Sequence, residues 1–131
     1  MPITYTTEER FGYILAVISG ETNSPEMLFD CIEAILTFPG LSEDFSRLMI
    51  DHRQLVFSGE DNAHYGVALR ISRDLHLESP LRIALVSRPE RFHSARLYEP
   101  VGSEFGTKVK VFTSAEEASV WLTGSRDSAL D

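Results

Sequence analysis

Three runs of apolar residues are nearly continuous in the sequence and predict buried strands. They cover residues 13–20, 48–51 and 81–87. A strand with one solvated face alternates apolar and polar residues, whereas a strand covered on both faces is apolar throughout, as in a parallel sheet. The sequence therefore predicts a largely parallel sheet at the centre of the fold.

Two shorter segments show the alternation that is typical of strands at the borders of a sheet. Residues 3–7 are rich in β-branched and aromatic residues, and residues 8–12 after them predict a hairpin-like turn. Since only this turn precedes the run at 13–20, we expect the first strand to be antiparallel and at an edge. Residues 108–112 alternate Lys with apolar side chains and predict a strand at the sheet border.

The first helix has a clear start in the sequence. Ser24 is a good N-cap, Pro25 fits the first helical position, and Glu26 suits the positive end of the helix dipole. The residues at 39–40, Pro-Gly, are expected to end the helix. Its predicted core-facing stripe is Met27, Leu28, Cys31, Ile32, Ile35 and Leu36.

Three more helices are predicted further along the chain. Residues 60–77 carry apolar residues at helical spacing, and another helix opens at Pro89 and ends near Gly102. Residues 113–117 hold two overlapping capping-box patterns that predict the start of a final helix. The capping pairs are Thr113 with Glu116 and Ser114 with Glu117, and the core-facing residues after them are Ala118, Trp121 and Leu122.

The element order is therefore ββαβαβαβα. Strands that alternate with helices imply right-handed crossovers. The predicted fold is α/β, with a five-stranded, mostly parallel (mixed) sheet and helices on both of its faces. We expect one domain over residues 1–123 and a flexible C-terminal tail over 124–131, where the residues are small and polar.

Composition narrows the choice of partner and compartment. The formal net charge of -8 argues against nucleic acid and anionic membrane surfaces as partners, because both need clustered Lys and Arg. The longest apolar run, residues 13–18, is too short to span a bilayer. The single cysteine, Cys31, lies in the apolar stripe and is expected in the core. With no secretory signal at the N-terminus, we expect a reducing, cytoplasmic location.

Polar residues follow the predicted strands, where an open parallel sheet usually binds its ligands. The most prominent are His52, Arg53 and Arg88, the last of which flanks a helix start together with Arg91. These residues either form a small polar pocket for an anion, or they are solvated charged side chains and caps of nearby helix ends. Asp51 and His52 are adjacent in a strand, so their side chains point to opposite faces and do not form a catalytic dyad.

No motif in the sequence specifies catalysis or a cofactor. Gly-rich phosphate loops, the Gly-x-Ser-x-Gly elbow and His-x-x-x-His or Cys-x-x-Cys spacings do not occur. His52 as a lone acid or base is the remaining enzymatic hypothesis. The sequence predicts a protein that is not an enzyme and has no cofactor and no metal site.

An apolar segment, Leu55 to Phe57, follows the polar step at residues 52–54 and is predicted to be an extended loop. Its side chains either cap the sheet from inside or form an exposed patch for a partner or an acyl-like ligand. If they form a patch, replacing Phe57 with Asp should abolish partner binding and leave the melting temperature nearly unchanged.

The element order, the Asp-ended strand at 48–51 and the C-terminal run Phe-Thr-Ser-Ala-Glu-Glu-Ala-Ser-Val-Trp-Leu at 112–122 resemble the SpoIIAA-like domains. These domains are related to the STAS fold of sulphate transporters and anti-sigma-factor antagonists, and the similarity covers residues 3–122. In the antagonists, a phosphorylated Ser lies in an Asp-Ser-Ser-Gly motif after the second central strand. That motif is absent here; the count from Asp51 places Glu60 at the acceptor position, with Ser58 two residues earlier.

The resemblance implies two classes of function. The first is a non-enzymatic regulatory or protein-interaction module that acts through the helix starting near Glu60 and the loop before it. The second is a binder of a small apolar or lipid-like ligand, with a pocket between helix and sheet as in Sec14-type domains. The candidate binding residues are His52, Arg53, Leu55, Phe57, Ser58, Glu60 and Arg88. The expected partner is a protein or a small apolar ligand, and a homodimer is an open alternative.

Overall fold

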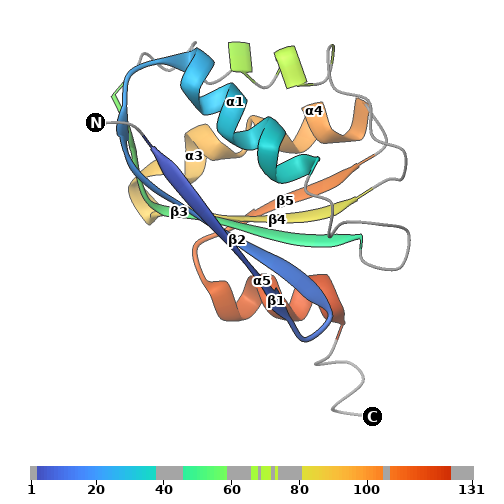
Figure 1. Ribbon diagram of the computed structural model, residues 1–131. Coiled ribbons are helices and arrows are strands. Elements are labelled where there is room, and N and C mark those ends of the chain that lie inside the picture. The colour runs from blue at the N-terminus through green and yellow to red at the C-terminus, as the bar shows by residue number, and fades with distance from the viewer. Residues whose placement is uncertain are drawn as a thin grey trace.

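A five-stranded sheet with the strands in the order β1-β2-β3-β4-β5 runs through the middle of the computed structural model (Figure 1). The structure describes residues 3–37, 46–58, 66–67, 69–71, 73, 81–104 and 107–124. The strands are β1 (Thr4–Arg10), β2 (Tyr13–Thr22), β3 (Arg47–Phe57), β4 (Arg82–Val86) and β5 (Lys108–Phe112). The helices are α1 (Pro25–Leu36), the 3-10 turn η1 (Pro89–Arg91), α3 (Phe92–Ala95), α4 (Tyr98–Glu104) and α5 (Ala115–Thr123).

The strand directions confirm the predicted mixed sheet. β1 pairs antiparallel with β2 at one edge, and β2, β3, β4 and β5 are parallel to one another. β5 forms the other edge, with the bounds that the alternation at residues 108–112 predicts.

Helices cover both faces of the sheet. Helices α1, α3 and α4 lie on one face, here called the α1 face, and α5 lies on the other, the α5 face (Figure 1). The described helical residues 66, 67, 69–71 and 73 belong to the predicted helix at 60–77, the rest of which lies outside the described residues. They pack on the α1 face, because Val67 and Ile71 join its core and the Arg70 guanidinium lies 4.0 Å from the centre of the Phe29 ring.

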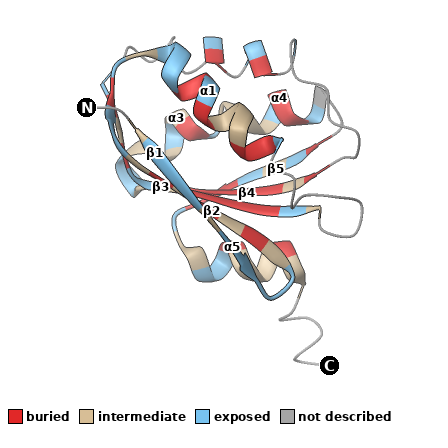
Figure 2. Cartoon of the chain, viewed as in Figure 1, coloured by how far each residue is buried: buried red, intermediate tan, exposed pale blue. Residues whose placement is uncertain are grey.

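The sheet separates two apolar cores. The larger, on the α1 face, includes Ile14, Leu28, Ile35, Leu48, Ile50, Ile83 and Val111; the smaller, under α5, comprises Met49, Ala84, Val86, Phe112, Ala118 and Leu122. Buried residues therefore alternate between the two cores along β4, as a strand covered on both faces requires. Figure 2 shows most of this strand as buried. The expected burial of β2 on both faces is wrong for one face. Tyr13, Leu15 and Val17 remain partly exposed because α5 packs mainly on β3, β4 and β5.

The predicted start of α1 is confirmed. The Ser24 hydroxyl accepts a hydrogen bond from the Met27 amide at 3.2 Å, and Pro25 is the first helical residue. The predicted core stripe is largely right, but Met27 is exposed and Phe29, which the stripe omits, is buried. The helix ends at Leu36, and residues 39–40, expected to end it, lie outside the described residues.

The single helix predicted from Pro89 to about Gly102 is in fact η1, α3 and α4 in succession. Pro100 explains the break, because its ring would clash with the Arg96 carbonyl in a continuous helix and it has no amide to donate. The chain restarts at Tyr98, so that Pro100 falls in the first turn of α4, and the Arg96 carbonyl instead accepts from the Glu99 amide at 3.1 Å. At the last helix, Ser114 caps the amide of Glu117 at 3.2 Å.

The predicted loop at Leu55–Phe57 is wrong, because these residues form the last part of β3 and pair with β2. Leu55 and Phe57 are 6% and 2% exposed and belong to the core of the α1 face. They cap the sheet from inside, and no exposed patch forms from these two side chains. Phe57→Asp would therefore place a charge in the core, and the expectation that it leaves stability unchanged is wrong.

Phe57 and Phe11 offer a matched test of this burial. Phe57→Ala should lower the free energy of unfolding by about 3–5 kcal/mol, because it empties a packed site. Phe11→Ala, at a side chain that is 98% exposed in the β1–β2 turn, should change it by less than about 0.5 kcal/mol. Urea denaturation of both variants measures the difference, and equal effects would contradict the burial of Phe57.

Gly102 is the point of closest approach between α4 and β5. A Cβ atom there would overlap Cγ2 of Val109 and lie 3.0 Å from the Thr107 carbonyl oxygen, whereas a Cβ at helical Gly66 meets nothing within 4 Å. Gly102→Ala should therefore destabilise the protein by about 1–3 kcal/mol through overpacking. Gly66→Ala should be neutral or stabilising by up to about 1 kcal/mol. The denaturant midpoint should fall in Gly102→Ala and should stay the same or rise in Gly66→Ala.

Candidate functional site

A bulge in β3 lies at the centre of the candidate site. In the pairing with β2, Val17 lies opposite Asp51 and Ser19 lies opposite Gln54, so β3 contains one residue more than β2 over this step. Side chains alternate between faces with a period of two, so one extra residue moves every later side chain to the other face. Leu55 and Phe57 consequently point to the same face as Leu48 and Ile50.

Asp51 and Arg53 hold the bulge closed. The Asp51 carboxylate accepts from the Arg53 amide at 3.1 Å, from its Nε at 3.0 Å and from its Nη2 at 2.8 Å. Burial of Asp51, which is 8% exposed, would raise its pKa. The hydrogen bonds from the Arg53 side chain and backbone outweigh this effect, and the pKa of Asp51 is lowered. Arg53, expected as a ligand-binding residue, is thus part of a structural ion pair.

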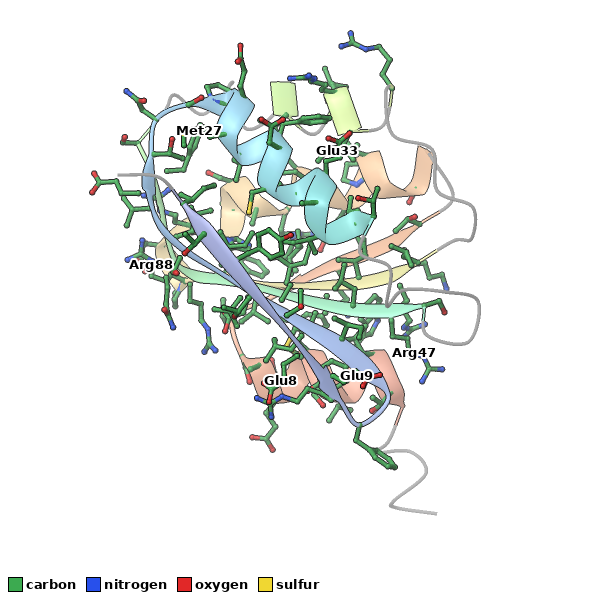
Figure 3. The ribbon with its side chains drawn as sticks, in the orientation of Figure 1. Glu8, Glu9, Met27, Glu33, Arg47 and Arg88 are labelled. Carbon is green, nitrogen blue, oxygen red and sulfur yellow. The ribbon has the colours of Figure 1, made fainter. Side chains whose placement is uncertain are left out.

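Arg88 and Arg91 bind the part of β3 that extends beyond β4. The β3–β4 pairing ends at Asp51 and Val86, so among the described strands none pairs with the last residues of β3 on that side. Arg88 Nη2 donates to the Leu55 carbonyl at 3.4 Å and Arg91 Nη1 donates to the Phe57 carbonyl at 3.0 Å. The two guanidinium groups therefore replace a missing strand, and Figure 3 shows Arg88 at this end of the sheet. Arg88 also forms an ion pair with Glu90, with 3.6 Å between Nε and Oε1.

The other polar groups at the carboxyl ends of the strands also make local contacts. The Thr22 hydroxyl accepts from the Ser24 amide at 3.0 Å, and the Ser87 hydroxyl donates to the Arg88 carbonyl at 2.9 Å. Ser114 caps α5. Of the two alternatives for this edge, local caps and solvated charges describe these groups better than a polar ligand pocket.

Ser58 and Glu60 are the two predicted site residues that the count from Asp51 places near the phosphorylated Ser of the antagonists. Ser58 is exposed, and its amide donates to the Thr22 carbonyl at 3.0 Å. Glu60 lies outside the described residues.

An apolar pocket lies between the sheet and the helices of the α1 face. Its volume is about 70 Å³, and its walls come from β2, β3, β4, β5, α1 and α4 together with Ile71. The predicted residues His52 and Leu55 both line it, which places two of the candidate residues in one site. His52 faces this pocket, whereas Asp51 belongs by alternation to the opposite face, as the sequence predicts. Helix α4 adds Tyr98, Val101 and Gly102 to the lining.

Burial holds two titratable groups of the α1 face, Tyr98 and Cys31, in their neutral forms. Burial raises the pKa of the Tyr98 phenol far above its usual value of 10.0, so its hydroxyl remains protonated. Burial also raises the pKa of Cys31 to about 11. The Cys31 thiol is therefore a poor nucleophile at neutral pH, which suits a core residue.

The described residues contain no group of three or more His, Cys, Asp and Glu side chains arranged to hold a metal ion. In the same part of the chain, no helix has the length and apolarity needed to cross a membrane.

The Asp51–Arg53 contact predicts a dependence of stability on pH. Because the pKa of Asp51 is lower in the folded protein, its contribution is present above its usual pKa of 3.8 and is lost as the pH falls through the folded value. Asp51→Asn should lower the free energy of unfolding by about 1–3 kcal/mol at pH 7. It should also flatten the decline of stability below about pH 4.

Urea titrations at several pH values measure both effects. Glu8→Gln is the control, because the exposed Glu8–Arg10 pair should contribute less than about 1 kcal/mol. If Asp51→Asn retained the wild-type pH profile, the carboxylate would not be the group that responds.

Comparison with known proteins identifies the fold and not a family. No protein-family model matches the chain. No curated protein matches it either. Among solved structures, an anti-sigma factor antagonist from Mycobacterium paratuberculosis matches with a TM-score of 0.55 and 18% identity over 92% of this chain and 93% of that one. An uncharacterized protein of the DUF3478 family with a SpoIIAA-like fold, from Shewanella loihica PV-4, matches with a TM-score of 0.46 and 15% identity over 92% and 93% of the two chains.

The first of these similarities, together with the observed strand order, confirms the predicted SpoIIAA-like α/β fold. At this level of identity a shared fold does not establish a shared function. The chain has the fold of an anti-sigma factor antagonist.

Proposed function

We propose that this chain is a non-enzymatic binding protein that holds a small apolar ligand in the pocket of the α1 face. The observation that carries the proposal is the pocket itself, about 70 Å³ of space among apolar side chains. Protein interiors are close-packed, so apolar side chains that line an open pocket lack part of the contacts they would make in a filled core. A ligand that fills the pocket supplies those contacts.

The chemistry of the lining defines the ligand. His52 and Tyr98 are the polar side chains of the lining, and the other lining residues are aliphatic or Gly. An apolar cavity stays dry and accepts apolar guests. The ligand is therefore a short hydrocarbon group with at most one polar end, which His52 or the protonated Tyr98 hydroxyl can meet.

We propose binding rather than catalysis because the polar residues near the site already make structural contacts. Asp51, Ser87 and Ser114 each hold a local structural contact, and burial raises the pKa of the Cys31 thiol. These groups are engaged in the fold, so binding accounts for the site better than bond-breaking chemistry does.

A filling variant tests the pocket. Ile32, on α1, is partly buried and lines the pocket, so Ile32→Phe should occupy the space and weaken binding of 1-hexanol by about tenfold or more. Val120→Phe is the matched control, because Val120 lies on α5 at the opposite face of the sheet. Titration followed by the methyl NMR signals of isoleucine gives the affinities.

Native mass spectrometry of the purified protein supplies a second readout. A bound small molecule that wild type and Val120→Phe retain and Ile32→Phe lacks would support the proposal. If wild type binds no hexanol and carries no ligand, or if Ile32→Phe binds as well as wild type, the pocket is not a binding site.

A regulatory protein-interaction module is the second candidate, and the fold shared with an anti-sigma factor antagonist favours it. Its contact surface cannot be Leu55 and Phe57, because both are buried. Met27 on α1 and Leu69 in the helical segment near Glu60 are large apolar residues that are 39% and 40% exposed. A dimer mass without any ligand in the same native spectra would favour this candidate over the first.

A further inference from the structure

A groove of about 390 Å³ lies at the outer edge of β5, and four of the side chains that line it are cationic. They are Arg82, Arg96, Lys108 and Lys110. The whole chain has 20 Asp and Glu against 12 Lys and Arg, so its formal net charge is -8. The groove is therefore a positively charged region on a protein that is negatively charged overall. It lies near the amino ends of β4 and β5, away from Arg88 at the carboxyl ends.

One carboxylate lines the groove, and it is already engaged. Glu99 Oε1 accepts from Arg96 Nε at 3.2 Å, and Glu99 Oε2 accepts from the Val111 amide at 2.9 Å. Glu99 thus neutralises Arg96 and leaves the lysines to be matched by something else. Lys108 and Lys110 are exposed, and neither makes an ion pair within the part of the chain that the structure describes.

The register of the sheet brings further like charges together. Arg47 lies opposite Arg82, and Arg82 lies opposite Lys108, so three cations form a row across β3, β4 and β5. Register partners on neighbouring strands share a face and lie about 5 Å apart, and like charges in this arrangement destabilise a sheet. Figure 3 shows Arg47, which begins the row, at the amino end of β3. An anion beside the row would relieve the repulsion.

Arg82 is held in place before any ligand binds. Its Nη2 donates to the Trp121 carbonyl at 2.8 Å, and its guanidinium carbon lies 4.1 Å from the centre of the Trp121 ring. Its Nε is buried and has no hydrogen-bond partner among the described residues. A fixed cation loses little conformational freedom when a ligand binds, so binding costs less entropy.

The edge of β5 favours a compact ligand over an added strand. The Lys108 amide and the Phe112 carbonyl bond toward β4, so residues 107, 109 and 111 present their backbone groups outward. The Thr107 amide already donates to the Gly102 carbonyl at 2.9 Å, and the Val111 amide donates to Glu99. An incoming strand would find these donors occupied. The volume of the groove falls in the range of small-molecule sites.

We propose that the β5 groove binds a small, multiply charged anion that carries phosphate or carboxylate groups. Lys108 and Lys110 contact the anion directly, and Arg82 supplies a fixed positive charge beside them. This site adjoins the apolar pocket, since Val109 lines both, but it does not depend on the function proposed for that pocket.

The composition of the chain offers a direct test, because Lys108 and Lys110 are its only two lysines. Reductive methylation with carbon-13 keeps the positive charge and labels these two amines and the N-terminal amine. Addition of inorganic pyrophosphate or citrate at low salt should shift both lysine NMR signals with saturation and leave the N-terminal signal in place. The response should weaken as sodium chloride is added.

Two variants with the same change of charge provide the control. Lys110→Gln should weaken pyrophosphate binding by about tenfold, as expected for the loss of one contact to a charged group. Arg10→Gln, in β1 at the opposite edge of the sheet, should change it by less than about twofold. Calorimetric titration of the unmethylated proteins measures both.

Each outcome decides the proposal. If only pyrophosphate saturates the lysine signals, the site is specific for phosphate groups. If only citrate does, it is specific for carboxylates. If both do, it is a general anion site. No lysine shift up to about 10 mM of either anion, or equal loss of affinity in the two variants, overturns the proposal. Tenfold tighter binding of hexaglutamate than of either small anion also overturns it, because the occupant would then be an acidic segment of a protein.

Discussion

The fold around the candidate site depends on the bulge in β3 that Asp51 and Arg53 close. One extra residue moves Leu55 and Phe57 from the face they would otherwise occupy into the core of the α1 face. His52 keeps the alternation set by Ile50 and faces the apolar pocket, and β3 then continues past the end of β4. A buried carboxylate at a bulge would be costly alone, and the three hydrogen bonds from Arg53 make it tolerable.

The extension of β3 in turn explains why two arginines follow β4. Backbone carbonyls that lose a neighbouring strand must find other donors, and Arg88 and Arg91 supply them from the two ends of η1. Both cations suggested an anion site when the sequence was considered by itself. Their role in the structure is to complete a sheet, which leaves them less free to bind a ligand. The cationic surface lies instead along β5, where Lys108 and Lys110 form no ion pair with another described residue.

Local signals in the sequence were enough for most of the fold. Ser24 and Pro25 mark the start of α1, and the apolar runs locate β2 and β4, because these features depend on residues next to one another in the chain. The bulge could not be predicted in this way: its position is set by the pairing of Asp51 with Val17 and by the core that receives Phe57. The break before Tyr98 was available in principle from Pro100, whose missing amide excludes it from the interior of a helix.

The same distinction applies to the candidate sites: single residues could be predicted from their place in the chain, but the groups they form could not. His52 and Leu55 were predicted from their place after a strand, but the pocket that joins them needs α4, whose Gly102 allows close contact with β5. The row of Arg47, Arg82 and Lys108 involves residues far apart in the sequence and exists only through the register of three strands. An overall charge of -8 hides such a row, because composition averages over the surface. Net charge therefore excludes a partner such as nucleic acid more safely than it excludes a small anion, which needs only a few well-placed cations.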